Sequence, residues 1–195
     1  AVFGSPEQYA QEYVPNDAAH YPKSVYGGSK SFNEVVASHY INEYGLDITA
    51  IRYSFVYGIG QRTGIISHVL KELIENPVLG KPGRVPYGDD SFGWLYVNDA
   101  SRATIIISKV AKPKTMVFTI AGEIRPVKDA VNYVKSLLPG ADITLLPGLI
   151  YGGTVWKHDT TPLSEEIGFT PQWSLEKGLK DSISLVRRQH GLPPL

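Results

Sequence analysis

Residues 48–57 form a run of β-branched and aromatic side chains that ends at Gly58, and this run limits the folds open to the chain. A strand that is apolar along its length has to be covered on both faces, as the strands of parallel sheets are. Residues 24–44 precede it with apolar side chains at helical spacing, and Gly45 provides a C-terminal stop. A helix that leads into a buried strand predicts an α/β fold with a parallel sheet.

Comparable patterns continue along the chain. Residues 4–22 are rich in Pro, Tyr, Gln and Asn and predict a long surface loop. Residues 1–4 have the pattern of the end of a buried strand whose beginning is missing, which suggests a truncated chain. Asn98 or Asp99 is expected to cap a helix that ends near Val110. Further helices are expected at 64–75, 126–138, 161–167 and 175–190, and short strands at 84–87, 94–97, 116–121 and 143–146.

Charge and composition exclude several classes of function. The 195 residues include 19 basic and 19 acidic side chains, so no net field favours nucleic acid or an anionic membrane. The chain has no cysteine, and its five histidines lack metal-like spacing, so we expect no metal site. No apolar stretch approaches the roughly 20 residues of a membrane span, and no signal peptide is apparent. These features favour small-molecule chemistry in the cytoplasm.

Tyr26 and Lys30 carry the chemical signal. They are four residues apart near the start of the expected helix and therefore share one face. A phenol with an ordinary pKa of about 10 is a poor base at neutral pH, and roughly 4 kcal/mol of phenolate stabilisation would correct this. A neighbouring ammonium can provide much of it. Such pairs are also common on solvated helix faces, so the spacing alone leaves both interpretations open.

The surrounding residues add a family resemblance. Residues 26–34, Tyr-Gly-Gly-Ser-Lys-Ser-Phe-Asn-Glu, resemble the active-site helix of the extended short-chain dehydrogenase/reductases, which include the NAD-dependent epimerases and dehydratases. Weaker matches follow in the family's order. They are Arg52-Tyr53 with Val56-Tyr57-Gly58, then Tyr87-Gly88-Asp89, then Tyr96-Val97-Asn98-Asp99, and finally residues 163–179. The resemblance thus covers nearly the whole chain.

The family's architecture implies how this chain is organised. The fold would be part of a Rossmann-like, doubly wound parallel sheet with a small C-terminal substrate-binding α/β subdomain. Residues 1–62 would be the C-terminal part of the Rossmann-like domain with the active-site helix. Residues 63–195 would mainly form the substrate-binding subdomain, with some elements returning to the sheet.

The resemblance also assigns roles to individual residues. Tyr26 would be the general acid and base of hydride transfer to a nicotinamide, and Lys30 would stabilise its phenolate and bind the nicotinamide ribose. Tyr53 and Ser54 would line the nicotinamide side of the cofactor, either NAD or NADP. Tyr87 would line the substrate pocket together with Phe55 and Phe92. The implied reaction is epimerisation, dehydration or dehydrogenation of a sugar, with a nucleotide-sugar among the possible substrates.

Two features depart from the family. The glycine-rich turn that binds the dinucleotide pyrophosphate has no counterpart in the sequence, so this chain alone is expected to bind the cofactor poorly and to be inactive. Members that act on nucleotide-diphosphate sugars commonly have asparagine at the position of Phe55 and arginine at that of Phe92. Phenyl rings do not bind phosphate, so Arg62, Lys81 or Arg84 replaces these groups or the substrate lacks the nucleotide.

Two interpretations of function therefore stay open. The preferred one is an NAD(P)-dependent enzyme, and the alternative is a non-catalytic binding or assembly module built on the same scaffold. The sequence predicts a homodimer or larger assembly in either case, because the missing strands would leave an apolar sheet edge and related enzymes associate through the tyrosine-bearing helix. Candidate contacts are Val35, Val36, His39 and Tyr40.

Overall fold

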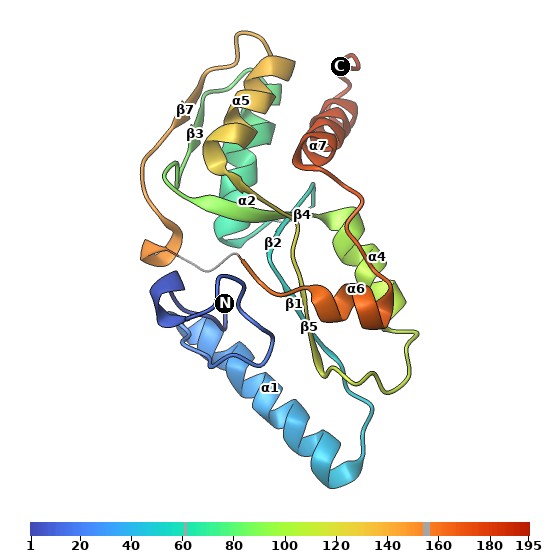
Figure 1. Ribbon diagram of the computed structural model, residues 1–195. Coiled ribbons are helices and arrows are strands. Elements are labelled where there is room, and N and C mark those ends of the chain that lie inside the picture. Colours follow the sequence, from blue (N-terminus) through green and yellow to red (C-terminus); the bar gives the residue numbers. More distant parts are fainter. Residues whose placement is uncertain (61, 154–156) are drawn as a thin grey trace.

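The structure, a computed structural model, describes residues 1–60, 62–153 and 157–195 (Figure 1). Its α-helices are α1 Val25–Tyr44, α2 Gly64–Leu70, α3 Asn76–Val78, α4 Val97–Ile107, α5 Val127–Leu137, α6 Thr161–Ile167 and α7 Leu175–Gln189. Its strands are β1 Ala50–Tyr53, β2 Phe55–Tyr57, β3 Gly83–Val85, β4 Ser91–Tyr96, β5 Val117–Ile120, β6 Glu123–Pro126 and β7 Ile143–Leu145. Short turns of 3-10 helix are η1 Pro6–Gln8 and η3 Ile150–Gly152, and the π-helix η2 Lys71–Glu75 connects α2 with α3. The predicted elements beyond residue 24 are therefore present, most within a few residues of their expected bounds.

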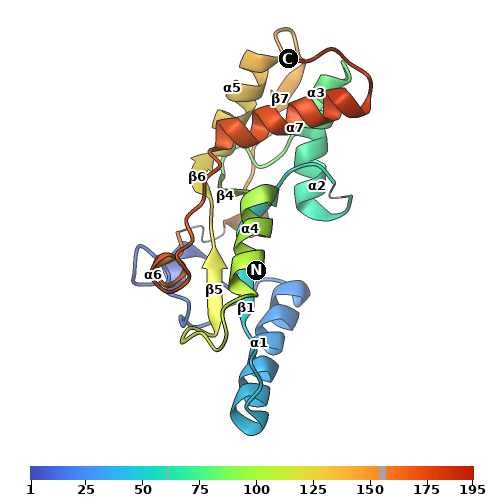
Figure 2. The same cartoon turned by 90° about the vertical axis from the view of Figure 1, so that its right-hand side faces the viewer.

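The sheets confirm the predicted parallel α/β class. Strand β1 pairs with β5, β2 with β4, and β3 with β7, all in parallel, and β6 joins β4 in the antiparallel sense. Helices lie on both sides of the strands. Figure 2 shows β5 between α4 and α6, and these elements enclose a core that includes Leu95, Ala103, Phe118, Leu163 and Phe169.

The run at residues 48–57 differs from the single buried strand that was predicted. It forms two strands, because at Ser54 the chain leaves β5 and begins to pair with β4. The Ser54 amide donates to Ile120 O at 3.0 Å, and its hydroxyl donates to Gly93 O at 2.8 Å. Only the second part is deeply buried, since Tyr53 at the end of β1 is 43% exposed. The apolar sequence pattern indicated burial, but it did not predict that the chain would change its paired strand at Ser54.

Residues 1–4 also differ from expectation. They are largely buried, but they do not form the predicted strand. The carbonyl of Val2 accepts the Tyr21 amide, and the side chains of Val2 and Phe3 pack with Val14 in a small core of their own. A strand requires a neighbouring strand for its ladder, and none lies beside these residues in the described ranges.

The predicted cap of the helix at 97–107 was wrong. Helix α4 begins at Val97 after Tyr96, and Asp99 is fully buried within its first turn. One Asp99 oxygen accepts the backbone amides of Gln172 and Trp173, at 2.8 and 2.9 Å, and the other accepts from Arg102 at 2.8 Å. The carboxylate therefore fixes the segment that leads to α7 instead of capping its own helix.

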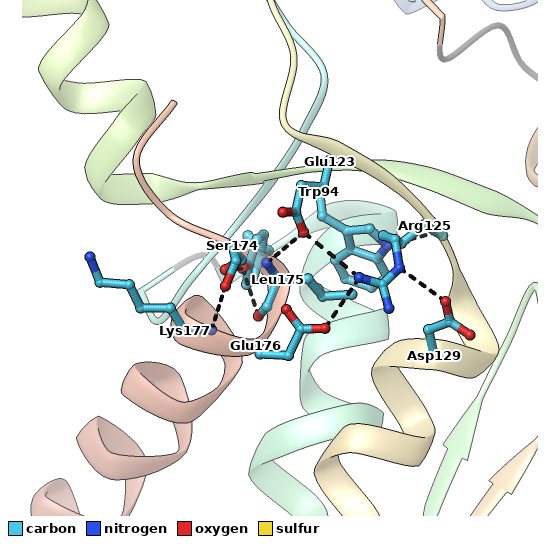
Figure 3. Close-up of polar contacts among 9 residues, drawn as sticks. Trp94, Glu123, Arg125, Asp129, Ser174, Leu175, Glu176 and Lys177 are labelled. Atoms are coloured by element: carbon cyan, nitrogen blue, oxygen red, sulfur yellow. Dashed lines mark hydrogen bonds and ion pairs between the residues drawn. The ribbon is translucent and has the colours of Figure 1, made fainter. Parts of the chain in front are cut away.

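A second charged group joins the starts of α5 and α7 to the sheet (Figure 3). Arg125 on β6 donates to Asp129 of α5 at 3.0 Å and to Glu176 of α7 at 3.2 Å. Glu123 accepts the Leu175 amide at 3.0 Å, so it caps the first turn of α7. Trp94 in the largest core cluster donates its indole N–H to the Arg125 carbonyl at 3.0 Å. These contacts position both helices against β4 and β6.

Helix α1 is held to the sheet mainly by charge. Gly27 is its one buried residue, and the helix projects beyond the rest of the molecule in both views. Arg52 of β1 makes a two-bond ion pair with Glu34, with Nε to Oε1 at 2.8 Å and Nη2 to Oε2 at 2.6 Å. Its remaining donors reach Asn16 O and His20 Nε2, both at 2.8 Å. We call these four residues the Arg52 network.

The Arg52 network determines the state of His20. Since Nη2 of Arg52 is a donor, His20 Nε2 accepts, and the neutral ring carries its proton on Nδ1. Partial burial and the adjacent guanidinium both lower the pKa of His20, against a smaller opposite effect of Glu34. The histidine is therefore held neutral between the loop and the helix.

The first prediction concerns the ion pair. Replacing Glu34 by Gln should lower the free energy of unfolding by about 3–5 kcal/mol, because it leaves the Arg52 guanidinium buried without its counter-charge. Glu43→Gln, which removes the same charge from an exposed position of α1, should change it little. Urea unfolding of both variants measures the difference, and equal effects would contradict the role of the pair.

The second prediction concerns pH. The lowered pKa of His20 means that below about pH 6.5 the unfolded chain binds a proton that the folded chain excludes. The stability of the fold should therefore fall as the pH drops from about 7.5 to about 5.5. His20→Gln keeps an acceptor for Arg52 and does not titrate, so its unfolding free energy should vary less over this range. A variant with the same pH dependence as the natural chain would refute the assignment.

Candidate active site

The candidate site begins with the first turn of α1. Ser24 caps the helix, and its hydroxyl accepts the Gly27 amide at 3.0 Å. Gly27 lies against backbone, since a Cβ atom there would come within 2.3 Å of Ala1 O. No side chain larger than hydrogen fits without movement of one of these segments. This contact fixes where the helix starts and thereby where Tyr26 and Lys30 lie.

Tyr26 and Lys30 are brought together as their spacing predicts. The Lys30 ammonium lies over the Tyr26 ring, 5.2 Å from its centroid. Tyr26 is 62% exposed, so its phenol is open to a reactant. The Ser29 hydroxyl, between the two in sequence, donates to the Tyr26 carbonyl at 2.7 Å and does not compete for the phenol. The pair has a cation–π arrangement in which the ammonium faces the ring.

Tyr53 and Ser54 lie at the carboxyl end of β1, where ligands of open α/β sheets bind. The Tyr53 hydroxyl is 2.5 Å from Thr104 Oγ1. Thr104 donates its own proton to Ala100 O, so Tyr53 is the donor of the pair. The Ser54 hydroxyl is engaged by Gly93 O. In this structure both side chains face the protein, although part of the Tyr53 ring stays exposed.

Phe55, Phe92 and Tyr87 gather in one aromatic group. The rings of Phe55 and Phe92 stack with centroids 4.3 Å apart at 18°, and the Tyr87 ring meets Phe92 edge-on at 6.4 Å. Phe55 and Phe92 belong to the largest core cluster and are almost fully buried, together with Trp94. Tyr87 has a left-handed backbone with φ of 65°, which is uncommon for a side chain of this size. The structure thus places two of these residues within the core and Tyr87 at its margin.

Other tyrosines of the core are unsuited to acid–base work. Burial raises the pKa of Tyr57, and the neighbouring Tyr96 and acidic groups raise it further. Burial also raises the pKa of Tyr96, whose hydroxyl donates to Asp181 at 2.5 Å. Both phenols stay protonated at neutral pH. Tyr26 differs from them in its exposure and its adjacent ammonium.

Sequence reasoning missed the Arg52 network. Glu34 and Arg52 each belong to a motif that was recognised, but nothing in the sequence joined them. Their pairing links the helix that carries Tyr26 to the strand that carries Tyr53. Asn16 and His20 lie in the segment predicted as a long surface loop, and both residues bind Arg52 and so join that loop to the network. The sequence signal that could have predicted this ion pair was the presence of opposite charges, Glu34 and Arg52, in two neighbouring motifs.

The described residues contain no group of three or more His, Asp or Glu side chains placed to hold a metal ion. Among the helices in these ranges, none is long and apolar enough to cross a membrane.

Comparison with known proteins gives relatives that are longer than this chain. An uncharacterized 37.6 kDa protein of Escherichia coli O111:H- is 25% identical over 197 residues, which cover 90% of this chain and 58% of the relative. The UDP-glucuronic acid 4-epimerase of Bacillus cereus, solved with UDP-glucuronic acid and NAD, has a TM-score of 0.81 at 22% identity. The L-threonine 3-dehydrogenase of Trypanosoma brucei has a TM-score of 0.80 at 17% identity.

The two solved structures share the fold over almost the whole chain. The match covers 96% of this chain with the epimerase and 93% with the dehydrogenase, and in each case 59% of the longer protein. The chain therefore spans about 60% of the length of these relatives. Residues 1–121, which include α1 and the strands β1, β2, β4 and β5, match a family described as NAD dependent epimerase/dehydratase. The chain belongs to the NAD dependent epimerase/dehydratase family.

Proposed function

We propose that this chain supplies the acid–base pair and the substrate-binding part of an NAD(P)-dependent epimerase, dehydratase or dehydrogenase that acts on a sugar-type carbinol. The exposed Tyr26 phenol with the Lys30 ammonium over its ring is the observation that carries the proposal. Family membership supports it, because the family is NAD dependent. Residues 1–62 would form the part nearer the cofactor, and residues 63–195 mainly the part that binds the substrate.

In the proposed reaction Tyr26 exchanges a proton with the substrate hydroxyl. A bound nicotinamide would accept and return the hydride of the same carbon. Lys30 would stabilise the phenolate and donate to the ribose hydroxyls of the cofactor. Tyr53 and Ser54, at the carboxyl end of β1, would border the nicotinamide, and the exposed part of the Tyr53 ring is suited to that contact. The chain lacks the glycine-rich turn for the pyrophosphate, so weak cofactor binding by this chain alone stays a prediction.

The solvent exposure of Tyr26 limits how strongly the Lys30 ammonium can stabilise its phenolate. Two charges about 5 Å apart interact by less than about 1 kcal/mol in bulk water but by about 3 kcal/mol at the effective dielectric of a protein surface. A phenol needs roughly 4 kcal/mol of phenolate stabilisation to act as a base at neutral pH. The ammonium is therefore effective once substrate and cofactor displace water from Tyr26, and the positive nicotinamide would then add to its effect.

The aromatic group favours a substrate without a diphosphate at that position. The side chains of Phe55 and Phe92 offer no hydrogen-bond donor, and their rings stack in the core beside the paired strands β2 and β4. Arg84, one of the cations considered as a replacement, is engaged by Asp142 at 3.3 Å and Thr144 at 2.9 Å. The solved structures of similar fold include enzymes named for a nucleotide-sugar and for an amino acid, so the fold is compatible with either substrate class. Tyr87, at the margin of the core, would contact the substrate, and Phe55 and Phe92 would support this apolar wall from within the core.

The exposed face of α1 supports association with a second copy. Large apolar side chains on this helix are solvent-exposed, including Phe32 at 66% and Val35 at 65%. Val35 and Tyr40 are exposed and Val36 is half-buried, so these members of the predicted contact are available to a partner helix, as is His39. Contiguous apolar surface of this kind is typical of protein interfaces. We propose a homodimer in which α1 packs against its twin.

The third prediction tests the reaction. In the complete enzyme, Tyr26→Phe should lower turnover by about 10²- to 10⁴-fold, because it removes the proton that is transferred. Tyr44→Phe removes a hydroxyl from the far end of the same helix and should leave turnover unchanged. Lys30→Met should slow turnover and shift its pH profile to alkaline values, since the phenolate loses its cation. Steady-state kinetics with NAD(P) decides the matter, and a Tyr26→Phe enzyme with over half the natural rate would refute the proposed role of Tyr26.

The fourth prediction tests association. Static light scattering at micromolar concentration should give at least twice the 21.4 kDa mass of the chain. Val35→Lys places a charge in the proposed contact and should shift the equilibrium to monomer, whereas Lys109→Glu, outside α1, should not. The assembly should persist in high salt, because apolar burial stabilises it. A monodisperse monomer of the natural chain would rule out this surface as an interface.

A further inference from the structure

Residues 146–153, which we call the strap, connect parts of the chain that are far apart in sequence. The strap leaves β7 at Leu145 and includes the turn η3. Figure 1 shows that η3 lies beside the N-terminal segment, away from the β3–β7 pair where the strap begins. Its Ile150 is buried in the largest core cluster, so the strap is packed against the protein at its middle.

The turn at residues 87–90 holds the first half of the strap. The Gly88 amide donates to Leu146 O at 2.7 Å. Asp89 accepts the Gly148 amide at 2.8 Å, and Asp90 accepts the Ile150 amide at 2.9 Å. Asp90 is 7% exposed, and its second oxygen accepts the Ser91 amide at 2.8 Å. The carboxylates of Asp89 and Asp90 thus bind two backbone amides of the strap that are two residues apart.

Lys23 holds the other end. Its ammonium donates to Gly153 O at 3.0 Å and lies 3.5 Å from Tyr151 O. Lys23 directly precedes Ser24, the cap of α1, and is three residues from Tyr26, which limits the separation of their Cα atoms to roughly 11 Å. The end of the strap is therefore attached to the residue that leads into the helix turn of the proposed acid–base residue.

At each of the two attachments of the strap, one residue has a backbone conformation that is unfavourable by itself. Tyr151 in the strap and Tyr87 in the turn have left-handed backbones, with φ of 49° and 65°. This conformation costs roughly 1–2 kcal/mol for a residue with a side chain, so it persists where surrounding contacts determine it. The strap should accordingly loosen as a unit when one fastening is removed.

We propose that the strap forms a border of the substrate site beside Tyr26, and that Lys23 and Asp90 are positioning residues that hold it there. Lys23 acts through the carbonyls of the strap and takes no part in proton transfer. Its removal should weaken substrate binding and leave the chemical step intact. The kinetic part of this inference rests on the proposed function, whereas the attachment of the strap does not.

The fifth prediction tests the strap by amide hydrogen exchange. In Lys23→Met, exchange at Gly153 and Ile150 should accelerate by about five- to tenfold, the size expected for the loss of one solvent-exposed hydrogen bond of ordinary strength. Lys23→Arg can donate to the same carbonyls and should restore protection. Lys109→Met, just past the end of α4, removes the same charge outside the strap and should have no effect. Unchanged exchange at Ile150 in Lys23→Met would show that the two ends are independent and would overturn the strap.

Kinetics of the complete enzyme separate this inference from the proposed function. Lys23→Met should raise KM for the substrate by about threefold or more with kcat and its pH profile unchanged, whereas loss of the Tyr26 phenol acts on kcat. An unchanged KM together with faster exchange would refute the substrate border. If Tyr26→Phe left turnover intact, the proposed reaction would fail while the exchange result on the strap still held.

Discussion

The Arg52 guanidinium is the contact on which the candidate site depends. Helix α1 buries little apolar surface, so packing contributes little to its position. Arg52 joins it through Glu34 to β1, and through Asn16 and His20 to the N-terminal loop. A guanidinium has five donors in a fixed plane, and here they reach three residues in two separate segments. Lysine has no such geometry, so the network explains why an arginine precedes the Tyr53-Ser54 end of the strand.

In the sheet, separate parts of the molecule are joined where a strand changes its hydrogen-bonded partner. The chain changes its paired strand at Ser54 and again between β5 and β6. Gly122 lies at the second change, and a Cβ atom on this residue would be 1.7 Å from the carbonyl oxygen of Trp94. Both changes occur beside the same stretch of β4. Beyond Ser54 the two cores lie on opposite faces of the paired strands β2 and β4. Phe55, Tyr57, Trp94 and Tyr96 belong to the core around Trp94, whereas Val56 and Leu95 pack into the core around Phe118.

These features mark the limit of prediction from sequence. Local sequence patterns located α1, α2 and α4 to α7, but not the short helix α3, because helical periodicity is a local property. The Ser54 break, the burial of Asp99 and the Arg52 network depend on residues 18 to 74 positions apart, so no local pattern contains them. Family resemblance compensated in part, because it selected Tyr26 and Lys30 from the twelve tyrosines and the many lysines of the chain. It could not show that Phe55 and Phe92 stack within the core.

The electrostatics of the site follow from where these contacts lie. The Arg52 network places a cation and a carboxylate two helical turns beyond Tyr26, and they neutralise each other at 2.6 Å. Their combined field at the phenol is therefore small, and Lys30 is left as the cation that acts on it. The Lys23 ammonium is directed to backbone carbonyls of the strap instead of to the phenol. The three cations thus have separate contacts, because Arg52 holds the helix and Lys23 holds the strap, and Lys30 faces Tyr26 as the proposed reaction requires.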